Sequence, residues 1–182
     1  MLTTERLRLR EWRDDDLAPY AALNADPRVR EFFPGTMTLE ESAASMAQIR
    51  EHFARHGYGP WAVEVIDVAR AAPFIGFIGL SIPPFDAPFM PRVEVGYRLA
   101  FDHWGQGYAT EGARAALAFG FESLGLDEIV AMTAVRNARS RHVMEKLGMT
   151  RDPADDFDHP NLPEGHPLQR HVLYRIGKSG IP

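Results

Sequence analysis

The sequence contains no cysteine among its 182 residues. This absence excludes disulfide bonds, thiolate metal sites and any covalent intermediate carried by a cysteine thiolate. Long apolar runs are missing as well, since no segment approaches the roughly 20 residues that a membrane-spanning helix needs. Charged residues also interrupt residues 1–6 before an apolar signal core can form. We therefore expect a cytoplasmic protein that does not act in a membrane.

Basic residues are fewer than acidic ones. Lys and Arg total 20 against 25 Asp and Glu, which gives a formal net charge of −5. Proteins that bind the nucleic acid backbone usually carry the opposite balance, so no nucleic-acid partner is expected. His52 and His56 have a spacing that could bind a metal on a helix, but no third ligand is evident and no metal site is predicted. With a hydrophobic fraction of 45%, the chain fits one globular domain over residues 1–182.

The pattern of apolar residues predicts a mixed α+β fold rather than a regular alternation of strands and helices. Thr38 and Glu41 have the spacing of a capping box, which predicts a helix that runs to about His56 and stops at Gly57. Acidic residues open another predicted helix over 14–24. We further expect helices over 107–124 and 140–147, a long loop over 152–170, and strands over 6–10, 61–66, 73–81, 93–99, 129–134 and 172–176.

The segment from Trp104 to Glu111 carries the strongest chemical signal. It follows a predicted strand and opens a helix with the sequence Gly105-Gln106-Gly107-Tyr108-Ala109-Thr110. The two glycines let the backbone approach a ligand, and the unpaired N–H groups of a first helical turn bind anions such as a pyrophosphate. A Walker A loop needs a lysine here, and the dinucleotide fingerprint needs a third glycine where Thr110 stands, so neither fits. A tight turn without a ligand stays open at this point.

A second segment, Asn137 to Met149, follows the next predicted strand. Together the two segments resemble the GNAT superfamily of N-acetyltransferases, whose cofactor motif Gln/Arg-x-x-Gly-x-Gly/Ala falls on residues 102–107. The first position departs from the motif, because it is Asp102. The run Trp-Gly-x-Gly-Tyr-Ala-Thr-Glu, with residues 5–10 and 26–29, resembles the RimJ/RimL branch, which is known for acetylating the N-termini of ribosomal proteins. The resemblance covers nearly the whole chain.

The resemblance implies a twisted, mostly antiparallel sheet whose central strands, here 93–99 and 129–134, splay apart to admit acetyl-CoA. It also implies transfer of an acetyl group to a primary amine, either a protein N-terminus or a small amine. Three basic residues either reach the 3′-phosphate or are solvated charges on a short helix: Arg139, Arg141 and Lys146. The implied cofactor contacts are the backbone of Tyr97, Arg98 and Leu99 with the pantetheine arm, the backbone of Gly105, Gln106, Gly107, Tyr108, Ala109 and Thr110 with the pyrophosphate, and the side chain of Asn137.

Acid–base chemistry is expected from two residues. An amine must be neutral to attack a thioester, so the site needs a proton acceptor. Glu94 lies on the opposite face of its predicted strand from Tyr97, and the family often has a glutamate on this strand; a solvent-facing residue is the alternative reading. The superfamily's usual general acid, a tyrosine seven residues after Asn137, is replaced by Met144. Ser140 is the nearest hydroxyl, either as a supporting proton donor or as the N-cap of its helix.

The acceptor is left open by the sequence. Many acidic residues lie in the predicted loop at 152–170. A negative field there would attract a protonated amine, but a solvated acidic loop is the simpler explanation. Two alternatives to acetylation of a protein N-terminus remain. One is an acetyltransferase for polyamines or antibiotics, and the other is a coenzyme A-binding domain without catalysis. The sequence also leaves a homodimer open.

Overall fold

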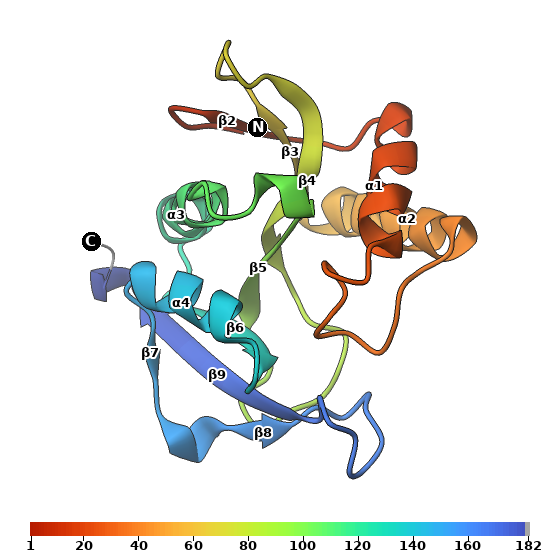
Figure 1. Ribbon diagram of the computed structural model, residues 1–182. Helices are drawn as coiled ribbons and strands as arrows, with labels where there is room; N and C mark the ends of the chain where they lie inside the picture. Colours follow the sequence, from red (N-terminus) through yellow and green to blue (C-terminus); the bar gives the residue numbers. More distant parts are fainter. Residues whose placement is uncertain (181–182) are drawn as a thin grey trace.

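A sheet of nine strands forms the centre of the protein, whose computed structural model describes residues 1–180. The strand order is β1-β2-β3-β4-β5-β6-β9-β7 with β8 attached to β9, and all neighbours are antiparallel except β5 and β6. This is the predicted α+β fold (Figure 1). The strands are β1 (Leu2–Thr3), β2 (Leu7–Arg10), β3 (Pro60–Val65), β4 (Ala72–Ser81), β5 (Val93–Leu99), β6 (Glu128–Ala134), β7 (Thr150–Arg151), β8 (Phe157–Asp158) and β9 (Arg170–Gly177).

The α-helices of the described chain cover both faces of the sheet. Figure 1 shows α3 and α4 on one side, the α3/α4 face, and α1 and α2 on the other, the α1/α2 face. The largest buried cluster packs Leu117 and Phe121 of α3 against the sheet, and a smaller one holds Tyr20 and Met46 of α1 and α2. No helix within residues 1–180 is long and apolar enough to cross a membrane. The helices are α1 (Leu17–Ala25), α2 (Leu39–His56), α3 (Tyr108–Glu122) and α4 (Ala138–Lys146).

The ends of α2 follow the predicted capping chemistry. The Thr38 hydroxyl accepts from the Glu41 N–H at 3.1 Å, and the Glu41 carboxylate accepts from the Thr38 N–H at 2.7 Å. Gly57 then ends the helix in the left-handed region, with φ 74°. The helix predicted over 14–24 begins later than expected. Residues 14–16 form a separate 3-10 turn, and α1 begins only at Leu17.

The sheet opens between β5 and β6. The edge of β5 that faces away from β6 stays paired with β4 as far as Leu99. We call the opening between residues 95–99 of β5 and 131–134 of β6 the gap. It confirms the predicted splaying of these two strands. The two strands are paired at only two positions, Val93 with Ile129 and Glu94 with Val130.

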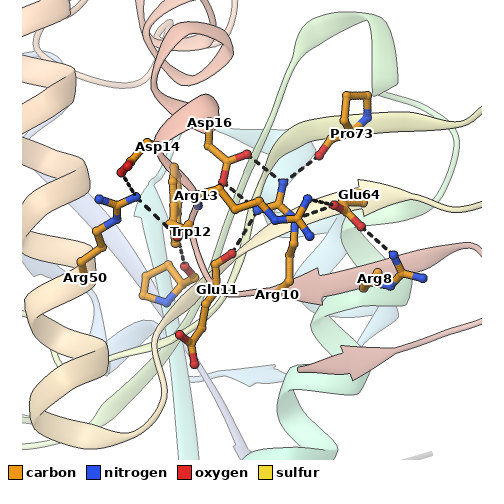
Figure 2. A network of polar contacts seen from close by, with 11 residues as sticks. Arg8, Arg10, Glu11, Trp12, Arg13, Asp14, Asp16, Arg50, Glu64 and Pro73 are labelled. Atoms are coloured by element: carbon orange, nitrogen blue, oxygen red, sulfur yellow. Dashed lines mark hydrogen bonds and ion pairs between the residues drawn. The ribbon is translucent and has the colours of Figure 1, made fainter.

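A buried ion network stabilises the position of the chain between β2 and α1 (Figure 2). The Arg10 guanidinium donates two hydrogen bonds of 2.7 Å to Asp16 and one of 2.6 Å to Glu64. Arg8 and Arg13 each lie 3.0 Å from the Glu64 carboxylate. Burial alone would raise the pKa of Glu64, but the three guanidinium groups outweigh it and lower that pKa. Glu64 is therefore a charged carboxylate with a structural role.

Candidate active site

The glycine turn, residues 105–107, leads from β5 into α3. Gly105 and Gly107 have φ values of 72° and 83°, which glycine adopts without strain. Just before the turn, the Trp104 indole N–H donates to the Leu99 carbonyl at 2.7 Å, which anchors the turn to the end of β5. Gly107 is the N-cap of α3 and supplies no side-chain cap. The first-turn N–H groups at 108–110 therefore have no partner within the helix, which is the arrangement that an anion-binding helix N-terminus requires.

Arg6, from the segment before β2, holds the glycine turn in place. Its Nη1 donates to the Gln106 carbonyl at 3.0 Å, and its Nε donates to the Glu111 carboxylate at 2.7 Å. Glu111 also accepts from the Arg6 backbone N–H at 2.9 Å and from the Thr4 hydroxyl at 2.6 Å. The Arg6 guanidinium lies 4.8 Å from the centre of the Tyr108 ring. Because this guanidinium is ion-paired with Glu111 at 2.6 Å, its role is to position the glycine turn rather than to supply free positive charge.

The backbone edge of β5 faces the gap at alternate residues. The Ala100 N–H donates to the Ile75 carbonyl of β4 at 2.8 Å. In an antiparallel pair, the backbone groups of every second residue point to the same neighbour. The backbone of Arg98 therefore faces β4, whereas that of Tyr97 and Leu99 faces the gap. Of the three expected pantetheine contacts, two lie on the gap and the Arg98 backbone is turned away from it.

The N-terminus of α4 lies beside the gap, and its cap corrects the prediction. Asn137 is the N-cap, because its Oδ1 accepts from the Ser140 N–H at 3.2 Å. Its amide nitrogen donates to the Thr133 hydroxyl at 3.0 Å, so both ends of the Asn137 side chain are engaged within the protein. The interpretation of Ser140 as the N-cap is wrong, since Ser140 is the third residue of the helix.

A pair of hydroxyls joins β5 to α4. The Tyr97 hydroxyl donates to the Ser140 carbonyl at 2.9 Å and lies 3.0 Å from the Ser140 Oγ. Burial raises the pKa of Tyr97 against the opposing effect of the Ser140 hydrogen bond, so the phenol stays protonated near neutral pH. Met144, at the position of the superfamily's tyrosine, is 2% exposed within the core. Sequence reasoning assigned only the backbone of Tyr97 and missed its hydroxyl.

Glu94 lies at the point where β5 and β6 part. It is three residues from Tyr97 on the same strand, so the two side chains project from opposite faces of the sheet. Burial raises the pKa of the Glu94 carboxyl to about 7, partly offset by a hydrogen bond from the Met132 backbone N–H. Unlike Glu64, this carboxylate has no guanidinium within residues 1–180 that stabilises its charge. A carboxyl that titrates near neutral pH is suited to accept a proton.

The acidic loop after β7 presents less free negative charge than its composition suggests. Three of its carboxylates are bound to arginines of β7 and β9, which neutralise them, whereas Asp152 and Glu164 form no ion pair within residues 1–180. The field with which this loop would attract a protonated amine is therefore weakened. The ion pairs are Asp155 with Arg175 at 2.8 Å, Asp156 with Arg151, and Asp158 with Arg170 at 3.3 Å.

Two hollows flank the site. The larger, of about 430 Å³, is lined by residues of the 83–91 loop. The smaller, of about 340 Å³, lies next to the glycine turn and is lined by Arg139 and Glu31 among others. Arg139 is ion-paired with Glu31 and lies 5.0 Å from the Trp104 ring, but its side chain is 57% exposed, as expected for a solvated charge. Neither lining includes Glu94 or Tyr97, so these two residues lie at the gap and not in the hollows.

Comparison with known sequences agrees with this geometry. The family model for the acetyltransferase (GNAT) domain matches residues 6–150. The uncharacterized protein YkkB of Bacillus subtilis is 32% identical over 149 residues, which cover 81% of this chain and 84% of that protein. FsC-acetyl coenzyme A-N(2)-transacetylase of Aspergillus fumigatus is 48% identical over 98 residues, which are 52% of this chain and 40% of that protein.

Solved structures share the fold. An acetyltransferase from Agrobacterium tumefaciens has a TM-score of 0.74 at 28% identity, over 96% of this chain and 92% of that one. Spermidine N-acetyltransferase from Vibrio cholerae, in complex with CoA and spermine, has a TM-score of 0.72 over 97% and 98% of the two chains. Its identity of 22% limits this likeness to the fold. The glycine turn, the gap and the family match together show that the chain belongs to the GNAT family of acetyltransferases, whose acyl donor is acetyl-CoA.

Proposed function

We propose that the chain is an acetyl-CoA-dependent N-acetyltransferase of the RimJ/RimL-like branch, which acetylates a primary amine on a protein N-terminus or a small molecule. One observation carries this proposal. A carboxyl with a pKa of about 7, that of Glu94, lies on one face of the gap. On the other face lies the hydroxyl pair of Tyr97 and Ser140. The motifs at 5–10, 26–29 and 104–111 support the branch.

The residues around the gap fit acetyl-CoA. The backbone edge at Tyr97 and Leu99 can pair with an extended chain that contains amide groups, as a missing strand would. The glycine turn, with Arg6 beside it, suits a pyrophosphate. Acetyl-CoA supplies a thioester whose carbonyl carbon accepts the amine and whose thiolate leaves.

Proton transfer falls to the chain's own side chains. Glu94 takes the proton from the acceptor amine, directly or through a water, while the Ser140 hydroxyl, positioned by Tyr97, donates a hydrogen bond toward the departing sulfur. The reaction needs a general base more than a general acid. A coenzyme A thiolate is an adequate leaving group near neutral pH, whereas a protonated amine cannot attack the thioester. The chain has no cysteine that could carry the acetyl group, which favours direct transfer in a ternary complex.

Two alternatives have support of their own. Polyamine or antibiotic acetylation uses the same scaffold, and the Vibrio cholerae neighbour is named for spermidine. A coenzyme A-binding domain without catalysis is favoured by the methionine at 144 and opposed by the Tyr97 hydroxyl. The cytoplasmic location and the homodimer stay predictions from the sequence.

The test measures turnover across acceptor classes. The protein is incubated with acetyl-CoA and with peptides that begin with Ala, Ser or Met, with spermidine, and with an aminoglycoside. Released thiol and the mass of the acetylated product are recorded, with Glu94→Gln as the control. We expect turnover with at least one amine in the wild type and its loss in the variant. Binding of acetyl-CoA without turnover of any acceptor would instead support the non-catalytic domain.

A further inference from the structure

A buried arginine without a carboxylate partner lies on the same face of β5 as Glu94. Arg98 is four residues further along the strand, so both side chains project from the α1/α2 face. Its Nη1 donates to the Asn24 amide oxygen at 3.0 Å, and Asn24 is in turn oriented by the Ser42 hydroxyl at 3.2 Å. The Nε of Arg98 is buried and has no hydrogen-bond partner. A guanidinium fixed in this way, with an unused donor, is costly unless something else binds it.

A second arginine lies close to the first. The Arg30 guanidinium lies 4.4 Å from the centre of the Phe33 ring, and that of Arg98 lies 4.3 Å from the same ring. Within residues 1–180, neither forms an ion pair at 4.0 Å or less, in contrast to Arg10. Glu41 attracts Arg30 only weakly, since its carboxylate already caps α2. Two positive charges thus lie together without a neutralising group.

The pKa of Arg98 reflects the neighbouring positive charge. Burial lowers the pKa of Arg98 to about 10, Tyr20 opposes this shift and Arg30 adds to it. Burial likewise lowers the pKa of Arg30. Both residues still carry their charge near neutral pH. Phe33 is 38% exposed, so the ring that both guanidinium groups contact is open to solvent.

There is open space over β5 between Glu94 and Arg98. Gly96 lies between them on the same face of β5, and a Cβ built on it meets no heavy atom within 4 Å. Four strand residues separate the Cα atoms of Glu94 and Arg98 by about 13 Å. A molecule whose amine reaches Glu94 can therefore lie over Gly96 and extend toward the two arginines.

We propose that Arg30, Phe33 and Arg98 form an anion-binding subsite for the acceptor, which is an amine carrying a carboxylate several bonds away. This inference rests on the proposed function, because it assumes that Glu94 accepts the proton of that amine. The guanidinium charges of Arg98 and Arg30, both beside the Phe33 ring, attract the carboxylate. A polyamine is disfavoured, because its second ammonium group would meet two guanidinium groups.

The test compares two amines of equal length, 5-aminopentanoate and 5-aminopentanamide, which differ in a carboxylate against a neutral amide. We expect kcat/KM of the wild type to favour the carboxylate at least about 10-fold, as a hydrogen bond between charged groups provides. Arg98→Gln and Arg30→Gln should each reduce that ratio toward one. Arg55→Gln removes an exposed charge whose ion pair is with Glu51 on α2, and it should leave the ratio unchanged.

The outcomes separate the two proposals. Equal turnover of both amines by the wild type, an unchanged ratio in both subsite variants, or a preference for spermidine over the carboxylate would overturn the anion subsite alone. Absence of turnover with these amines and with the peptide panel would overturn the proposed function and the subsite with it. If Arg98→Gln does not fold by circular dichroism, Arg30→Gln and the wild-type comparison still decide the question.

Discussion

Replacing Glu94 by glutamine tests the proton acceptor through both stability and rate. Burial raises the pKa of Glu94 from an ordinary 4.5 to about 7. At about 1.4 kcal/mol per pH unit, this difference corresponds to about 3 kcal/mol. Below pH 4.5 the carboxyl is protonated in both the folded and the unfolded chain. Between pH 4.5 and 7 the carboxyl is ionised in the unfolded chain but still protonated in the folded one. The free energy of unfolding therefore falls by up to about 3 kcal/mol as the pH rises.

Glu94→Gln removes this loss, because an amide does not titrate. Relative to the wild type, the variant should therefore gain about 3 kcal/mol of unfolding free energy between pH 4 and pH 8. Urea unfolding at a series of pH values measures this gain. In the same variant, kcat should fall by roughly 10² to 10⁴-fold, and its acidic limb near pH 7 should disappear. Cofactor binding should be unchanged.

The assay must separate Glu94 from the acceptor amine, which also titrates. Two acceptors serve this purpose, a peptide with an α-amino pKa of about 8 and an alkyl amine with a pKa of about 10. The limb near pH 7 belongs to the enzyme if it is common to both acceptors. Glu128→Gln is the matched control, because Glu128 begins β6 and is ion-paired at the surface with Arg92 and Arg175. A Glu94→Gln enzyme with the wild-type profile would refute the assignment of the base.

Three further predictions address the cofactor, the cap and the kinetic order. Gly107→Val should weaken acetyl-CoA binding more than about 10-fold by calorimetry, because a side chain at a φ of 83° is strained and obstructs the phosphate; an unchanged Kd would contradict this. Asn137→Ala should cost about 1 kcal/mol in urea unfolding as a lost N-cap, whereas Ser140→Ala should cost less stability but lower kcat by roughly 10-fold; the reverse ranking would restore Ser140 as the cap. Initial rates with both substrates varied should give intersecting double-reciprocal lines, and parallel lines or an acetylated protein by mass spectrometry would argue against direct transfer.

Local chemistry made parts of this fold predictable. The capping box of Thr38 and Glu41 and the glycine at 57 set the ends of α2 through contacts within a few residues. The alternation over 93–99 is also a local property of consecutive residues, and it correctly placed Glu94 and Tyr97 on opposite faces of the strand. The splaying of β5 and β6 was different, since it followed from family resemblance and has no local signal in either strand.

The features that sequence reasoning missed depend on distant residues or on a choice between equivalent ones. The contact of Arg6 with Glu111 joins residues 105 positions apart, and nothing near either residue signals the other. Asn137 and Ser140 are both good N-caps, so composition alone did not decide which of them begins α4. Neutralisation of the acidic loop depends on the register of β9, which brings Arg175 to Asp155.

The contact between Arg6 and Glu111 also constrains how the sequence can change over evolution. The carboxylate accepts from the guanidinium and the backbone N–H of one residue, so neither partner can be replaced alone without leaving a charge or a donor unsatisfied. In relatives that keep the glycine turn, we expect positions 6 and 111 to change together or to remain as they are. Residue 6 would then vary in step with the glycine turn rather than with the neighbouring strands β1 and β2.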